Sequence, residues 1–151
     1  MSFHQNAGKC PGCQTILNRY PGFHPGLRAW FERLQIDSPE AHISCAGRGQ
    51  IDQEALFVKK ATRAHWLESS HNYNAALDIF RNVALSLYDT HWFQQVVSPA
   101  LTNPKYCHTP GNPVVQLSWL GRPGSPFPEL PHVQLKDWVA MRKSGLLIPV
   151  Q

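Results

Sequence analysis

Two histidines and one aspartate in this 151-residue sequence have the types and positions of ligands for a catalytic zinc ion. Hydrolytic zinc sites take three protein ligands from His and carboxylate side chains and leave the fourth position open for water. His71 and Asp78 lie seven residues apart in SSHNYNAALDIF, so a loop can present His71 while the following strand presents Asp78. His132, at the start of a short apolar segment near the C-terminus, is the candidate for the third ligand.

A carboxylate close to the third ligand supplies the base that such a site requires. Glu129 precedes His132 by three residues, on the other side of Leu130-Pro131. A carboxylate beside the zinc takes the proton of the attacking water and passes it to the leaving amine, while the metal lowers the pKa of that water towards about 7. The combination predicts metal-assisted amide hydrolysis. Arg63, eight residues before His71, is the predicted donor to the developing oxyanion or to a substrate carboxylate.

Spacing alone does not separate these residues from chance pairs. The chain has eight His and ten acidic residues, and Glu68-x-x-His71 repeats the spacing of Glu129-x-x-His132. For any single histidine, an ordinary core or surface imidazole is the default interpretation. That interpretation applies to the remaining histidines, which are His4, His24, His42, His65, His91 and His108.

Cys10-Pro-Gly-Cys13 forms a second group of potential ligands. Its spacing is half that of a zinc knuckle, but no second Cys-x-x-Cys or His pair in the sequence completes it. Without a signal for secretion, the four cysteines are expected to be mostly reduced, which disfavours a disulfide framework. We therefore expect Cys10 and Cys13 to be ordinary thiols in a turn, with a structural metal as the alternative.

The composition predicts one soluble domain over residues 1–151, with residues 1–24 as a loosely attached N-terminal segment. Apolar residues make up 42% and charged residues 16% of the chain, so it can bury a core and is not expected to be disordered. No apolar run approaches the length of a membrane helix. The net charge of +4 comes from dispersed basic residues, so nucleic-acid binding is not expected.

Short elements must position the candidate ligands, because thirteen prolines and ten glycines divide the chain. Helical spacing is found in segments 25–35, 52–61, 89–101 and 136–143, and extended patterns in segments 75–80, 114–119 and 132–135. The strands predict a small antiparallel sheet. The proline-rich segment 120–131 is expected to be a rigid loop that leads into His132.

The segment around His71 resembles a motif of the M15 peptidases, the family of zinc D,D-carboxypeptidases, D,D-dipeptidases and phage endolysins. Ser69, His71, Ala76 and Asp78 match the pattern Ser-x-His-x-x-Gly-x-Ala-x-Asp, and Asn74 occupies the usual glycine position. The order and separation of the segments also agree with the family. The resemblance covers residues 45–135.

A second family motif, acidic-x-x-His, is similar to Glu129-Leu130-Pro131-His132, and Trp119-Leu120-Gly121 stands where the family often has Trp-Gly-Gly. The resemblance implies that His71, Asp78 and His132 bind Zn2+ and that Glu129 is the general base and acid. The family's arginine upstream of the first ligand corresponds to Arg63, with Arg48 as the competitor.

The resemblance further implies an α+β fold of the hedgehog/D,D-peptidase type, with helices around a small antiparallel sheet and zinc in a cleft on it. Small size and the absence of a signal peptide, membrane anchor or wall-binding module favour a phage or prophage endolysin. Such an enzyme is made in the host cytoplasm, is expected to be a monomer, and reaches the cell wall after release by a holin. Its expected cut is the L-alanyl-D-glutamate bond of the peptidoglycan stem peptide.

Two alternatives remain open at this point. Glutamate at the base position is similar to the dipeptidase branch, so a D-Ala-D-Ala carboxypeptidase or dipeptidase is the enzymatic alternative. From a different class, the chain is a non-catalytic phage structural or wall-binding protein on the same fold. Intact candidate ligands and an intact base favour the enzyme, because folding alone does not require a carboxylate at Glu129.

Overall fold

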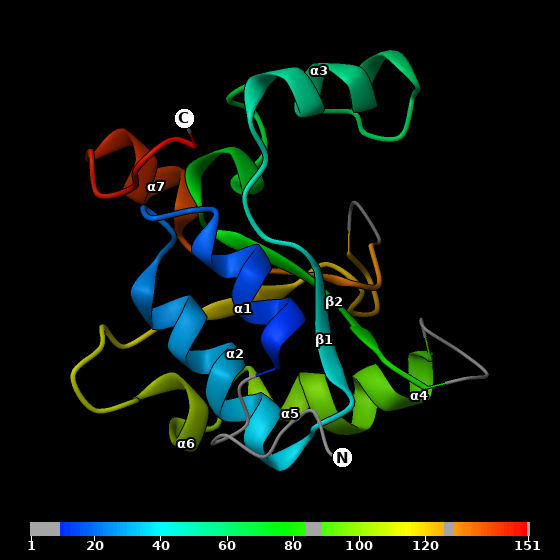
Figure 1. The fold of residues 1–151 in the computed structure, drawn as a ribbon, viewed down its shortest axis with the longest axis vertical. Helices are drawn as coiled ribbons and strands as arrows, with labels where there is room; N and C mark the ends of the chain where they lie inside the picture. Colours follow the sequence, from blue (N-terminus) through cyan, green and yellow to red (C-terminus); the bar gives the residue numbers. More distant parts are fainter. Residues whose placement is uncertain (1–9, 84–88, 126–128, 151) are drawn as a thin grey trace.

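The computed structural model describes residues 10–83, 89–125 and 129–150, in which an antiparallel sheet is surrounded by helices (Figure 1). The strands are β1 (Ala41–Cys45), β2 (Ala76–Arg81), β3 (Leu117–Trp119) and β4 (His132–Leu135), in the spatial order β1-β2-β4-β3. The helical segments are α1 (Pro11–Asn18), α2 (Pro25–Asp37), α3 (Gln50–Val58), η1 (Ser70–Tyr73), α4 (Thr90–Trp92), η2 (Phe93–Val97), α5 (Ser98–Ala100), α6 (Pro104–Cys107) and α7 (Trp138–Lys143). The α+β class expected from the sequence is confirmed.

The register of the central strands brings two candidate ligands together. β2 pairs antiparallel with β4, and Asp78 lies directly opposite His132. Directly opposed residues of an antiparallel pair project from the same face with their Cβ atoms close together. Asp78 also lies opposite Cys45 in β1, so the middle of β2 is the point where the site is assembled.

The core is built on the amphipathic helix α2, which the sequence periodicity predicts. Leu27, Trp30, Phe31 and Leu34 are at most 1% exposed, as the three- and four-residue spacing requires. The buried indole N–H of Trp30 donates to the carbonyl of Ala100 at 2.9 Å, which ties α2 to the helical run of α4, η2 and α5. Figure 1 shows α1 and α2 lying next to one another in front of the sheet.

The N-terminal segment differs from the loose attachment expected for residues 1–24. From Cys10 onward the chain is built into the domain, because α1 buries Cys13 and Leu17 and the following turn buries Phe23. Cys13 behaves here as a small apolar residue at helical spacing to Leu17. The interpretation of Cys10 and Cys13 as thiols in a turn did not take this spacing into account. The first nine residues lie outside the described part of the chain.

Strand β1 was not predicted from the sequence. Its burial alternates at the start, with Ala41 and Ile43 buried and His42 between them partly exposed. Ala-His-Ile-Ser-Cys contains one β-branched residue, so the local pattern for a strand is weak. Pairing with β2 determines the conformation instead.

The strand expected over residues 132–135 is β4 with the same bounds, and the other predicted elements are present with different ends. The helix expected over residues 52–61 is α3, and the strand expected over residues 114–119 is only β3, Leu117–Trp119. The helix expected over residues 89–101 forms as α4, η2 and α5 in succession, with Asp89 as N-cap accepting from the N–H of Trp92. The helix expected over residues 136–143 begins at Trp138 and is followed by Gly145 at φ 72°. In residues 10–83, 89–125 and 129–150, no helix has the length and apolarity needed to cross a membrane.

Candidate metal centre

His71 is held by the short 3-10 helix η1, whose ends are both determined by side chains. The hydroxyl of Ser69 accepts a hydrogen bond from the N–H of His71, and the side chain of Asn72 accepts one from the N–H of Ser69, which is a capping box. The segment ends at Asn74, whose φ of 56° and ψ of 34° lie in the left-handed region. Glycine is favoured there and asparagine is tolerated, so Asn74 fits the backbone of the motif position.

Three atoms of the candidate ligands form an equilateral triangle. His71 Nε2 lies 3.2 Å from Asp78 Oδ1 and 3.2 Å from His132 Nδ1, and the last two atoms are also 3.2 Å apart. A tetrahedral zinc ion with bonds of about 2.0–2.1 Å requires ligand atoms about 3.3 Å from one another. The triangle therefore has the dimensions of three corners of a zinc tetrahedron.

Hydrogen bonds at the far ring nitrogens turn a lone pair of each histidine toward the triangle. His71 Nδ1 lies 2.7 Å from the carbonyl of Ala46, which accepts its proton. His132 Nε2 lies 2.8 Å from Gln134 Oε1, and the Ser70 hydroxyl donates to the same oxygen at 2.9 Å. In its neutral form each ring would thus present an unprotonated nitrogen to a metal ion at the centre, as metal-binding histidines do.

The convergence of acceptors explains why a cation fits this position. The Asp78 side chain is 19% exposed and lies against two buried imidazoles, so water solvates its carboxylate only in part. Burial alone lowers the pKa of His71, but the charge of Asp78 and its hydrogen bond outweigh burial and raise it to about 10. A metal-free site would therefore hold a proton where a metal ion fits, and two imidazoles with one carboxylate suit Zn2+.

Cys45 is a further potential ligand on the opposite side of His71. Cys45, His71 and Asp78 also lie within ligand range of one another. The thiol, however, faces Nδ1 of His71 at 3.8 Å, and that nitrogen donates to Ala46. We take His132 as the third corner because its Nδ1 and His71 Nε2 both point to the same centre as Asp78.

Glu129 lies on the solvent side of the triangle. Its Oε2 is 3.5 Å from His132 Nδ1, and its side chain is 52% exposed, against 5% for His132. Its backbone N–H donates to the carbonyl of Leu120. The position suits a base that must reach a water at the open corner of the tetrahedron.

Trp119 and Gly121 fix the loop that carries Glu129. The indole N–H of Trp119 donates to the carbonyl of Leu130 at 2.7 Å. A Cβ at Gly121 would approach Trp119 Nε1 to 2.5 Å and the Cα of Leu130 to 2.8 Å. Glycine is therefore required by close packing, which gives Trp119-Leu120-Gly121 a physical role. Residues 126–128 of the proline-rich segment lie outside the described part.

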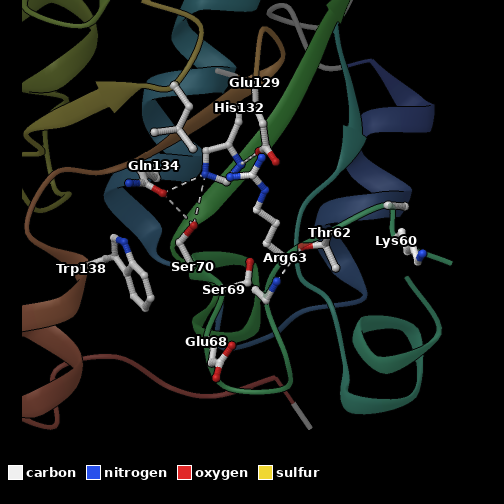
Figure 2. A pocket seen from close by; sticks show the side chains of 13 residues that line it. Lys60, Thr62, Arg63, Glu68, Ser69, Ser70, Glu129, His132, Gln134 and Trp138 are labelled. Atoms are coloured by element: carbon white, nitrogen blue, oxygen red, sulfur yellow. Dashed lines mark hydrogen bonds and ion pairs between the residues drawn. The ribbon is translucent and has the colours of Figure 1, made fainter. Parts of the chain in front are cut away.

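The two candidate arginines occupy different places. Arg63 lines a cavity of about 640 Å³ together with Glu129 and His132, and Figure 2 shows its side chain reaching toward both. Arg48 lies behind the ligands, with Nη2 3.9 Å from Asp78 Oδ2 and Nη1 donating to Gln53 Oε1. Arg63 thus lies on the cavity side of the ligands, and Arg48 lies beside Asp78.

Glu68, whose spacing to His71 equals that of Glu129 to His132, makes a local contact instead. Its Oε2 accepts a hydrogen bond from the N–H of His65 at 2.9 Å, which closes the turn before Ser69. Glu68 lines the same cavity, but its equal spacing to His71 does not bring its carboxylate into the triangle of ligand atoms.

Gln134 and Ser70 are functional candidates that the sequence interpretation missed. Gln134 lies two residues after His132 in β4, and alternate residues of a strand share a face. The strand predicted over residues 132–135 therefore already indicated that Gln134 lies on the same face as His132. Ser70 precedes His71, but its contact with Gln134 crosses 64 positions of the chain. Only the fold reveals that second partner.

Comparison with known proteins supports the fold. No family model and no curated protein sequence matches the chain. Among solved structures, the crystal structure of the L-Ala D-Glu endopeptidase ChiX of Serratia marcescens is similar, with a TM-score of 0.63 and 17% identity. The alignment covers 85% of this chain and 89% of that chain. At this identity the similarity shows that the chain has the fold of that endopeptidase.

Proposed function

We propose that the chain is a zinc-dependent peptidoglycan hydrolase that cuts the L-alanyl-D-glutamate bond of the stem peptide. The observation that carries the proposal is the 3.2 Å triangle of His71, Asp78 and His132 with Glu129 on its solvent side. The fold similarity to an L-Ala D-Glu endopeptidase supports this choice of bond.

The proposed chemistry divides between the metal and the chain. Zinc held by His71, Asp78 and His132 would act as a Lewis acid for the scissile carbonyl and would lower the pKa of a bound water. In this proposal Glu129 takes the proton from the attacking water and gives it to the leaving amine, a role that suits an exposed carboxylate beside the ligands. Arg63 donates N–H groups to the substrate side of the cavity, where an oxyanion or a substrate carboxylate accepts them.

The cavity beside the ligands suits an extended, anionic peptide. Trp138 and Leu120 contribute apolar surface, and Lys60 and Arg63 contribute positive charge to the same lining. A stem peptide offers small side chains and the free carboxylate of D-glutamate. In this proposal the enzyme works as a monomer of phage or prophage origin that reaches the wall after release by a holin.

The proposal is tested by digestion of purified peptidoglycan, with Glu129→Gln as the blank and mass spectrometry of the released fragments. Stem peptides that begin at D-glutamate are expected with the unaltered chain. Loss of only a terminal D-alanine would instead assign a carboxypeptidase, and hydrolysis of free D-Ala-D-Ala a dipeptidase. No Glu129-dependent change with any of the three substrates would contradict an enzymatic role and favour a binding protein.

A further inference from the structure

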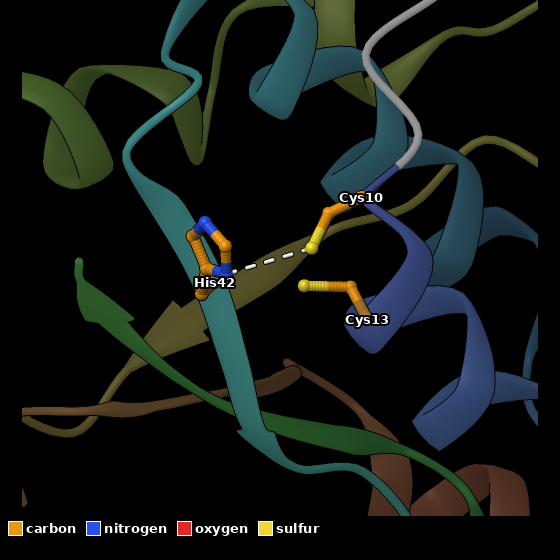
Figure 3. Close-up of side chains that lie close together, drawn as sticks. All are labelled: Cys10, Cys13 and His42. Atoms are coloured by element: carbon orange, nitrogen blue, oxygen red, sulfur yellow. Dashed lines mark hydrogen bonds between the residues drawn. The ribbon is translucent and has the colours of Figure 1, made fainter. Parts of the chain in front are cut away.

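A second group of metal-ligand side chains lies away from the candidate centre. Cys10 and Cys13 come from the start of α1, and His42 comes from β1, and Figure 3 shows the three side chains pointing toward one another. The sequence lacks a second Cys pair to complete Cys-x-x-Cys, but folding adds a histidine from 29 positions further along the chain than Cys13. We propose that Cys10, Cys13 and His42 bind a second zinc ion with a structural role.

The distances are close to those of a zinc site with two sulfurs and one nitrogen. Cys10 Sγ lies 3.6 Å from His42 Nδ1, and the three ligand atoms all lie within 4.8 Å of one another. Tetrahedral zinc, with bonds of about 2.3 Å to sulfur and 2.0–2.1 Å to nitrogen, separates S and N by about 3.6 Å and two S atoms by about 3.8 Å. The Cys10–His42 pair already has the required spacing.

Gln35 organises the two thiols from within the core. Its side chain is completely buried, and its Oε1 accepts from the N–H of Cys10 while its Nε2 donates to Cys13 Sγ at 3.5 Å. The N–H of Ile43 donates to the same sulfur at 3.4 Å. Two N–H donors on one sulfur stabilise a negative charge there, as the outer hydrogen bonds of a metal thiolate do.

Burial keeps the Cys13 thiol protonated in the metal-free chain. Cys10 and Cys13 are 3% and 2% exposed, and burial raises the pKa of Cys13 to about 11. When zinc binds, each thiol loses its S–H proton to solvent, so two protons are released per ion. Because His42 is partly exposed, a water molecule would complete the coordination.

Asn82 is suited to support His42 in this role. The side-chain amide of Asn82 lies 3.4 Å from His42 Nε2. For Nδ1 to bind zinc, Nε2 carries the proton, and a rotation of the amide presents the Asn82 oxygen to accept it. Such a partner at the far nitrogen is usual for metal-binding histidines.

The position of this second site suggests what it stabilises. It fastens α1 to β1, the edge strand whose continuation contains Ala46 and Arg48. Ala46 accepts the proton of His71, and Arg48 pairs with Asp78. A zinc ion at the edge of the sheet would thus stabilise the segment with Ala46 and Arg48, which supports the candidate catalytic ligands. This role does not depend on whether those ligands bind metal.

The zinc content of the full chain tests this inference. After equilibration with zinc and removal of the free ion, two zinc ions per chain are expected. The Cys10→Ser/Cys13→Ser variant is expected to keep one, and His132→Ala is expected to keep the other. Cys107→Ser is the matched control, because it removes a buried thiol elsewhere, and it should keep both zinc ions.

If the catalytic proposal fails but this one holds, the unaltered chain keeps one zinc ion and the double variant keeps none.

Cobalt substitution gives an independent readout. Thiolate ligands produce a near-ultraviolet charge-transfer band that His and Asp do not, so the band should vanish in Cys10→Ser/Cys13→Ser and persist in Cys45→Ser. His42→Gln keeps both thiols and should lose most of the metal affinity of this site, with an unchanged circular dichroism spectrum. This variant tests the proposal even if the double variant fails to fold. An unchanged zinc content and band in the double variant and in His42→Gln would overturn the proposal. A Cys10–Cys13 disulfide in the freshly purified, thiol-blocked chain would also overturn it.

Discussion

At the scale of single residues, the chemistry of the candidate centre depends on where protons sit. Ala46 and Gln134 accept the protons of the outer ring nitrogens, so both imidazoles, when neutral, can turn an acceptor nitrogen toward a metal ion beside Asp78. Glu129 contributes a carboxylate that is not needed for this arrangement and is largely open to solvent. Ligand function and base function are therefore separable by substitution.

Replacement of the base is expected to abolish turnover and to leave zinc in place. Glu129→Gln removes the proton acceptor but keeps the shape, so hydrolysis of peptidoglycan should fall by about 10²–10⁴-fold or more, with unchanged zinc content by metal analysis. Glu68→Gln is the matched control, because Glu68 has the same spacing to its histidine but contacts His65. Equal losses in the two variants would contradict the role of Glu129.

Removal of the proton acceptor of His132 is expected to weaken zinc binding. Gln134→Leu removes the oxygen at 2.8 Å from Nε2 of His132 and leaves only the Ser70 hydroxyl at 3.2 Å there, so the tautomer of the ring is held less firmly. Loss of such a partner lowers metal affinity by about 10–100-fold, which a competition titration with a chelator measures. Gln116→Leu changes an exposed glutamine just before β3 and should leave the affinity unaltered. An unaltered affinity in Gln134→Leu would show that this hydrogen bond does not orient the ligand.

At the scale of elements, two close approaches of the backbone make the site possible. The left-handed turn at Asn74 ends η1 and directs the chain into β2, and Gly121 lets the loop that carries Glu129 lie against Trp119. Both positions belong to motifs that were identified in the sequence. The physical reason for the residue at each position is clear only from the segment that packs against it.

A methyl group at Gly121 is expected to disturb the Glu129 loop. Gly121→Ala places Cβ 2.8 Å from the Cα of Leu130, and backbone cannot move as cheaply as a flexible side chain. We expect a loss of about 1–3 kcal/mol in the free energy of unfolding and a loss of about 10–100-fold in turnover, measured by denaturant titration and peptidoglycan digestion.

Gly12→Ala is the control for this substitution, because among the described residues only Cys10 Sγ, at 3.9 Å, lies near the position of its Cβ. It lies in α1, where alanine is favoured over glycine, so stability should be equal or slightly higher. A Gly121→Ala variant as stable and active as Gly12→Ala would refute the packing argument.

Local patterns predicted the elements that have strong periodicity and missed those that depend on distant partners. α2 and β4 were predicted because their apolar residues repeat at three to four and at two positions. β1 was missed because His42 interrupts a short apolar pattern, and α1 was missed because Cys13 was interpreted as a thiol in a turn and not as an apolar residue. Pairing and burial determine the structure of both elements. The same long-range contacts bring His42 to the two cysteines, which no spacing in the sequence indicates.

At the scale of the whole molecule, metal binding and folding are expected to be coupled. The ligands come from η1, β2 and β4, and the supporting groups come from the end of β1 and from β4. An unfolded chain cannot present them together, so zinc should stabilise the native state by about 2.7 kcal/mol at a hundredfold excess over its Kd.

Zinc affinity is expected to rise with pH. The charge of Asp78 raises the pKa of His71 to about 10 despite burial, so below that pH the metal-free site carries a proton that zinc must displace. Each pH unit weakens this competition about tenfold for one proton, so the Kd should fall steadily between about pH 6 and pH 8. Isothermal titration in the Cys10→Ser/Cys13→Ser background measures the site alone. A Kd that is constant or rises with pH would contradict the assigned proton.

The most direct test of the central claim is a diffraction measurement on crystals of the zinc-loaded chain, with data collected on both sides of the zinc absorption edge. The account predicts an anomalous peak at bonding distance, about 2.0–2.2 Å, from His71 Nε2, Asp78 Oδ1 and His132 Nδ1, with Glu129 facing its open side. A zinc-loaded crystal without a peak at that position, or with zinc held there by Cys45 in place of His132, would contradict it.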